Sequence, residues 1–339
     1  MSLPTIINYS LHSLKVQDAP VSGVQSLTFD KTVNITSIPT WGNPFISTNL
    51  HKKPNVSVNL VKFIADTVQP IVLDTGVYQK TYIRNAGKQS GILPYMGIHT
   101  SPVDIDIIIS AEPDTLNKSP VNNPVGIRCK DMLLNSLSYK FSTDGYFTEE
   151  CSFGGHSLES GVVNFDKKSE SATYIPHSGT TKRRPDFFIS GVPKEVATLL
   201  ASGAILTSAE VSISFDYGEY PSYGGFYTVA NKYVRYPFDI SCTFEVLDRT
   251  YLKYDNTMVG LVPNSGYLFR NDYKINLNTV DSELKNYEIC LGITGVLSID
   301  LGDNNYLASS DRSGGEAGQS SYTIYRFTYK NSNNVFTIS

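Results

Sequence analysis

The chain has 339 residues, of which 40% are hydrophobic and 18% charged, and its net charge is −4. This length supports one large or two medium domains with a sizeable core. The mildly acidic balance argues against tight binding of a nucleic-acid backbone, which needs clustered Lys and Arg. The 22 tyrosines and 16 phenylalanines, beside only 4 methionines, are typical of a β protein.

Neither a membrane span nor a signal peptide is predicted. No stretch approaches the roughly 20 apolar residues that cross a bilayer. The first residues, MSLPTIINYSLHSLKV, lack the basic start and apolar block of a secretory signal. We therefore expect a soluble protein that is made in a cytosol.

Strands dominate the first half of the chain. Period-two alternation of apolar residues predicts strands over 27–35, 56–64, 103–110 and 125–141. Within the last of these, Asp131 and Asn135 indicate a bend or bulge, because polar residues there interrupt the alternation.

A tight hairpin follows, in LSYKFSTDGYFTEECSFGGHS (137–157). Asp144-Gly145 between two alternating runs is a strong hairpin signal. A three-residue loop, 143–145, keeps apolar residues on one face because it pairs Phe141 with Phe147. Gly145 then takes the positive-φ position, where a residue without Cβ has no steric penalty.

Two adjacent glutamates, Glu149 and Glu150, lie in the returning strand and point to opposite faces. In the predicted register Glu149 stands opposite Tyr139 on the apolar face. Either that end of the face meets solvent, or another subunit supplies a partner for the carboxylate.

The second half repeats this character. Alternation predicts strands over 211–217, 238–246, 273–278, 289–301 and 321–329. A helix is predicted over 193–203, with Pro193 in the first turn and Gly203 as a stop, and a weaker one over 279–287. Residues 67–101 and 156–190 are predicted to be long connections that cover surfaces or contact neighbours.

The order of strands suggests a duplication. PNVSVNLVKFIAD (54–66) aligns with YPFDISCTFEVLD (236–248), which places Leu60 on Cys242. We interpret the chain as two β domains, 1–165 and 204–339, joined by 166–203 with its short helix. The alternative is the self-similarity of any all-β chain, in which alternation and turns recur.

Residues that carry chemistry are sparse, so we expect no enzyme, cofactor or metal site. The histidines have no metal-ligand spacing, and they are His12, His51, His99, His156 and His177. The cysteines lie in alternating runs and are interpreted as buried thiols, with disulfides as the alternative, and they are Cys129, Cys151, Cys242 and Cys290. Asp104 and Asp106 share a strand face and are interpreted as solvated.

Two segments are candidate contact loops between subunits. TKRRP (181–185) is the only basic cluster, and its candidate contact residues are Lys182, Arg183 and Arg184. YGEYPSYGGFY (217–227) has the Tyr, Gly and Ser composition of contact loops, and its candidates are Tyr220, Tyr223 and Phe226. For TKRRP the alternatives are a solvated loop and contact with nucleic acid. For YGEYPSYGGFY they are stacking on a sugar and a hairpin tip packed on itself.

The segment SLSYKFSTDGYFTEECSFGG resembles the long hairpin of tail tube proteins from long-tailed bacteriophages. The matching positions are Ser138, Tyr139, Phe141, Gly145, Phe147, Thr148, Glu149 and Gly154. In the second half, LGDNNYLASSDRSGGEAGQSSY replaces the short turn and lacks the Thr-Glu step, so the two halves are expected to differ there.

The resemblance implies two tandem tail-tube-like domains of the β-barrel or sandwich type. Such domains join their sheets side by side into a ring, and rings stack into a hollow tube that conducts the genome. The implied partners are three copies in a pseudo-six-fold ring or six copies, other tail proteins, and DNA that passes without specific binding. The implied location is the virion tail, assembled in the host cytoplasm without membrane contact.

On this interpretation one hairpin forms part of the lumen or of the assembly contact. Its candidate residues are Tyr139, Lys140, Asp144, Gly145, Phe147, Glu149 and Glu150. Alternatives are another tail component with the same domain (distal tail, hub or terminator protein), a carbohydrate-binding β-sandwich module, and a β-sandwich glycoside hydrolase.

Overall fold

The computed structural model describes residues 13–17, 19–33, 35–39, 46–51, 54–65, 68, 70–71, 102–109, 125–162, 187–219, 232–248, 287–317, 320–331 and 336–338. These residues form β-strands and one helix, α3 (Lys194–Ala201). The all-β fold class is therefore confirmed, and the described strands form open sheets rather than a closed barrel.

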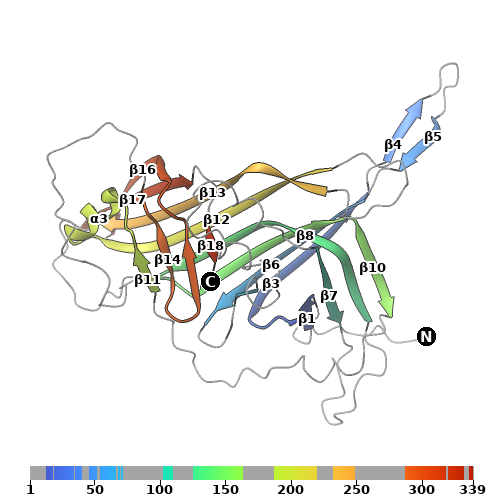
Figure 1. Cartoon of the computed structure of the whole chain (residues 1–339), viewed down its shortest axis with the longest axis horizontal. Coiled ribbons are helices and arrows are strands. Elements are labelled where there is room, and N and C mark those ends of the chain that lie inside the picture. The colour runs from blue at the N-terminus through green and yellow to red at the C-terminus, as the bar shows by residue number, and fades with distance from the viewer. Residues whose placement is uncertain are drawn as a thin grey trace, which may run out of the picture.

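Eight antiparallel strands run side by side through the largest sheet, and we call them the main sheet (Figure 1). Their order across the sheet is β3-β6-β9-β8-β12-β13-β17-β16. Their bounds are β3 (Val24–Thr32), β6 (Asn55–Ile64), β8 (Val125–Ser142), β9 (Phe147–Gly155), β12 (Ile205–Glu219), β13 (Lys232–Asp248), β16 (Asn305–Ala317) and β17 (Ser320–Asn331).

The main sheet repeats one strand order twice. In the first half the order β3-β6-β9-β8 places the first, second, fourth and third of these strands side by side. In the second half β12-β13-β17-β16 has the same arrangement. The two sets of four join where β8 pairs with β12, and this pairing is called the internal seam.

Strand β8 bends and so belongs to two layers. Residue Asp131 has φ of 53°, and its backbone N–H donates to Asp104 Oδ1 at 3.0 Å. Before the bend β8 pairs with β7 (Val103–Ile109) and β10 (Ser157–Val162), and after it with β9 and β12. The register also shifts between Leu134 and Ser136, so the predicted irregularities at 131 and 135 are confirmed.

The first-half layer that contains the start of β8, before the bend, is completed by β1 (Ser13–Val16), which pairs with β7, and by β2 (Ala19–Pro20). The second half has a separate four-stranded sheet, in the order β11-β14-β15-β18. Its bounds are β11 (Phe187–Ser190), β14 (Cys290–Ile293), β15 (Leu297–Asp300) and β18 (Thr337–Ile338).

Two predictions for the second half were wrong. Residues 289–301 are not one strand, because the chain reverses at Gly295 (φ 76°) to form the β14–β15 hairpin. The segment expected to replace a short turn contains β16, which pairs with β17 along its whole length. Alternation failed to predict β16 because most of its described side chains are exposed whichever face they occupy.

Other predicted elements differ at their ends. The first strand stops at Thr32, and Ile35 begins a separate hairpin of β4 (Ile35–Pro39) and β5 (Ile46–His51), which projects from the rest of the molecule (Figure 1). Strands β10 and β11 lie within the predicted connection 156–190. The strand predicted over 273–278 and residues 279–286 of the weaker helix lie outside the described residues.

The core lies between the main sheet and these second layers. Phe141 and Phe147 of the hairpin contact each other with ring centroids 5.4 Å apart, and Phe187 of β11 lies 5.2 Å from Phe141. All three side chains are buried, so this aromatic cluster packs the four-stranded sheet that contains β11 against the centre of the main sheet. All four cysteines are free thiols, and three of them are buried.

Candidate functional site

The hairpin of β8 and β9 has the predicted register. Leu137 pairs with Cys151 and Lys140 with Thr148, as the three-residue loop requires. Gly145 has φ of 110°, a conformation that a side chain would strain. Asp144 is exposed at the turn, and its backbone N–H donates to the Ser142 hydroxyl at 3.2 Å.

Glu149 neither meets solvent nor waits for another subunit, so that prediction was wrong. Its side chain is fully buried, Oε1 accepts from the Tyr139 hydroxyl at 3.0 Å, and Oε2 accepts from the Ile71 N–H at 2.6 Å. Lys62, 1% exposed, stands directly opposite Glu149 on β6. The sequence placed the carboxylate on the correct face, but Ile71 comes from a distant segment that alternation cannot position.

Glu150 lies on the opposite side, which we call the polar face of the main sheet. One row across this face runs through six strands from Val61 to Lys330, and its members are Val61, Glu150, Ser138, Ser212, Ser241 and Lys330. Hydroxyl groups recur along it, and the Ser212 hydroxyl donates to that of Ser138 at 3.2 Å. Alternate serines in LNSLSYKFS and VSISF are the sequence signal for this face.

Basic side chains on the polar face stand beside carboxylates. Three ion pairs are Arg326–Glu245 at 2.8 Å, Lys330–Asp239 at 3.0 Å and Arg235–Asp216 at 3.5 Å. The hydrogen bond to Glu245 raises the pKa of Arg326, and that to Asp239 raises the pKa of Lys330. Lys140 stands opposite Glu210 in the internal seam. Exposed pairs of this kind contribute little stability, so their main effect is on the charge that the face presents.

The main sheet ends on two exposed strands. Among the described strands, β3 pairs only with β6, and its residues are exposed on both faces apart from the half-buried Leu27. On the core side Phe29 is 46% exposed, although its neighbour on β6, Val58, is 1% exposed. Val24 and Val33 are also exposed. The buried core therefore extends as far as β6 but not to β3, which is the last strand of the main sheet on this side.

The other edge is β16, which pairs only with β17 among the described strands. Its first residues are covered, with Asn305 buried and Leu307 half-buried, whereas residues 308–314 are exposed. The sequence does not reveal this edge, because residues 308–314 have no buried face that apolar alternation could mark.

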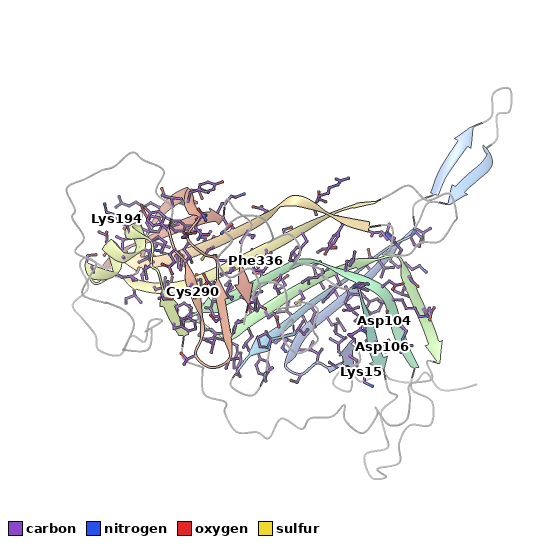
Figure 2. The ribbon with its side chains drawn as sticks, in the orientation of Figure 1. Lys15, Asp104, Asp106, Lys194, Cys290 and Phe336 are labelled. Carbon is purple, nitrogen blue, oxygen red and sulfur yellow. The ribbon has the colours of Figure 1, made fainter. Side chains whose placement is uncertain are left out.

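A row of charged side chains crosses the layer formed by β1, β7, β10 and the start of β8, at the end of the molecule opposite Lys194 (Figure 2). The register places Lys15, Asp106, Arg128 and Glu159 side by side on four strands. Asp106 is buried, not solvated as predicted, because Arg128 binds both its oxygens, at 2.6 and 2.7 Å. This bidentate bond raises the pKa of Arg128.

Glu195 of α3 joins the helix to the sheets. Its two oxygens accept from the Tyr287 hydroxyl at 2.7 Å and the Tyr329 hydroxyl at 2.9 Å. Burial raises the pKa of both phenols, and the carboxylate raises it further. The sequence predicted the helix with Glu195 near its start, but not these partners.

The candidate contact residues of the two loops lie outside the described residues, and they are Lys182, Arg183, Arg184, Tyr220, Tyr223 and Phe226.

Within the described part of the chain, no three His, Cys, Asp or Glu side chains gather as a metal ion would require. None of the described helical residues forms a helix long and apolar enough to cross a bilayer.

Comparisons with known proteins give little further definition. No family model matches the chain, and no curated protein matches it. One solved structure that it resembles is the anti-feeding prophage cap, a tube terminating cap. That match has a TM-score of 0.33 and 12% identity, and it covers 48% of this chain and 95% of the cap. At these values the likeness defines neither the fold nor the function of this chain.

Proposed function

We propose that this chain is a virion structural protein, a tail tube subunit whose copies form stacked rings around a channel for DNA. The observation that carries the proposal is a main sheet that ends, on both sides, in a long strand without a described neighbour. The resemblance of the β8–β9 hairpin to tail tube proteins supports the same role.

Long exposed edge strands are a hazard for a protein that works alone. They present a row of free backbone donors and acceptors, which monomeric proteins shorten, charge or cover. Here β3 has nine residues and β16 has thirteen. β3 also carries the exposed apolar side chains Phe29 and Val24. Copies of the chain that pair at these edges would cover both features.

The repeated strand order favours a duplicated domain, with the proposed domains 1–165 and 204–339 each contributing four strands to the main sheet. Chains that join head to tail form a closed ring when a whole number of copies completes one full turn. A ring of three copies would then contain six similar units; a ring of six would contain twelve.

The polar face suits a channel for DNA. A wall that binds phosphates tightly does so through Lys and Arg, with release of counterions. On this face Arg326, Lys330 and Arg235 each have a carboxylate within 3.5 Å. Duplex DNA would therefore pass along hydroxyl groups and paired charges, which bind its phosphates weakly.

Electron microscopy of the purified protein in negative stain tests the proposal. Rings or tubes with a central channel are the expected result, and a strict monomer at high concentration in sedimentation analysis would contradict it. Binding to a glycan array by such a monomer would instead favour the carbohydrate-binding alternative, and turnover of a chromogenic glycoside would favour the hydrolase. Immunogold labelling of virions distinguishes a tube subunit, along the whole tail, from a distal, hub or terminator protein at one end.

A further inference from the structure

We infer that β16 of one copy pairs antiparallel with β3 of the next copy, in a register that places Leu307 opposite Phe29. The inference rests on the proposed function, since it assumes that copies join at all. It names the two edges that meet and the residues that face each other.

The internal seam supplies the template. There β8, the third of the four main-sheet strands in the first half, pairs with β12, the first strand of the second half. The strand that corresponds to β8 in the second half is β16, and the one that corresponds to β12 in the first half is β3. Both are edge strands. A contact between copies that repeats the internal seam must therefore join β16 to β3.

The register follows from two equivalent rows of core-facing residues. In the first half the row is Leu27, Leu60, Cys151 and Leu137. In the second half it is Val211, Cys242, Tyr329 and Leu307. The sequence alignment that sets Leu60 on Cys242 makes these rows equivalent.

In the internal seam, the row of the first half is offset from the row of the second half by two residues. Leu137 stands opposite Ile213, which is two residues beyond Val211. The residue two beyond Leu27 is Phe29, so Leu307 of one copy stands opposite Phe29 of the next.

The side chains suit this register. Phe29 is the most exposed apolar side chain of β3, and Leu307 is half-buried. Directly opposite residues on one face of an antiparallel pair touch, so each would cover the other. On the polar face the same register sets Asp30 opposite Tyr306, so no like charges meet there.

Disulfide trapping tests the seam. Directly opposite residues have Cα atoms about 4.5–5.5 Å apart, within the range that a disulfide bridges. We expect the Phe29→Cys/Leu307→Cys double variant to crosslink between copies under mild oxidation. The matched control is Val33→Cys/Leu307→Cys. Val33 directly follows β3 and lies four residues after Phe29, so in the proposed register its thiol is not opposite that of Leu307→Cys. The wild type and the single variants measure the background from the native cysteines.

The crosslinked products also count the copies. On a non-reducing gel the ladder from Phe29→Cys/Leu307→Cys should end at the number of copies in a closed ring, three or six. Wild-type rings with crosslinking through Val33→Cys, or through neither pair, overturn the seam while ring formation stands. Absence of rings from the wild type overturns the proposed function and the seam together.

Hydrogen exchange gives a measurement without substitutions. Backbone amides of 24–32 and 305–317 should become protected when wild-type copies assemble, because both edges gain hydrogen-bond partners. Assembled rings in which either edge exchanges as fast as in the monomer contradict the seam, even where a cysteine variant fails to fold.

Discussion

The Tyr139 hydroxyl donates a 3.0 Å hydrogen bond to Glu149 Oε1, and neither side chain has exposed surface. The other carboxylate oxygen accepts from the Ile71 N–H. A polar group without a partner is costly inside a protein, so this carboxylate fixes both its neighbours. Glu149 is therefore a folding residue, although its position in the hairpin suggested an assembly contact.

The Glu149→Ala variant should lose folding stability. It removes the carboxylate that accepts from the Tyr139 hydroxyl and from the Ile71 N–H, and a buried polar group that loses its acceptor costs about 1–3 kcal/mol. For the two groups together we expect a loss of about 2–6 kcal/mol, measured by urea denaturation followed by circular dichroism. The adjacent Glu150→Ala is the matched control, since Glu150 is exposed on the polar face and should change stability by less than about 0.5 kcal/mol. Equal losses in both variants would contradict this assignment.

The bend in β8 predicts a second effect on stability. Asp131 has φ of 53°, which asparagine, aspartate and glycine adopt more readily than other residues. Asp131→Val should therefore be less stable than Asp131→Gly by about 1–2 kcal/mol, the cost of a left-handed conformation for a residue with Cβ. Thermal unfolding of the two variants side by side measures the difference, and equal stabilities would argue against the bend.

The first half of the fold could be predicted because its signals are local. Alternation in 125–141, together with Asp144-Gly145, determines the strands, the turn and the register between Leu137 and Cys151. The same signals predict that Glu149 and Glu150 face opposite sides. What surrounds each carboxylate depends on contacts distant in the sequence, such as that of Ile71 with Glu149.

The second half shows where alternation fails. The run from Ile289 to Leu301 alternates as one strand would, since the two strands of a short hairpin preserve the pattern if the turn has the right length. Strand β16 is exposed on both faces over 308–314, so no apolar face marks it. A strand that is exposed on both faces has no apolar face, so the periodicity of apolar residues cannot reveal it.

Buried thiols predict a loss of stability in alkali. Burial raises the pKa of Cys151 and Cys242 above the ordinary value of 9.0 and raises that of Cys129 to about 11. The unfolded chain loses these protons first, so their contribution to stability is complete below pH 9 and is lost as the pH rises. Each fully buried thiol lowers stability by about 1.4 kcal/mol per pH unit above 9.

Urea denaturation at pH 8 and pH 10 measures this effect, with Cys242→Val as the test variant. Its stability should fall less between the two pH values than that of the wild type, by about 1.4 kcal/mol. The difference between pH values cancels any packing change caused by the substitution itself. An unchanged fall would show that Cys242 ionises as readily in the folded state as in the unfolded chain.

The paired charges of the polar face predict how it meets DNA. Asp239→Asn with Glu245→Gln removes the carboxylates beside Lys330 and Arg326. Each cation that then contacts a phosphate adds about 0.9 to the salt dependence of binding, so the double variant should bind duplex DNA with a slope steeper by about 2. Fluorescence anisotropy between 50 and 200 mM salt, the interval over which such contacts weaken strongly, measures this. Asp30→Asn is the control, because Asp30 lies on the same face and accepts from the Thr32 hydroxyl rather than from a cation. If this single neutralisation steepened the slope as much as the double variant, net charge rather than pairing would govern the face.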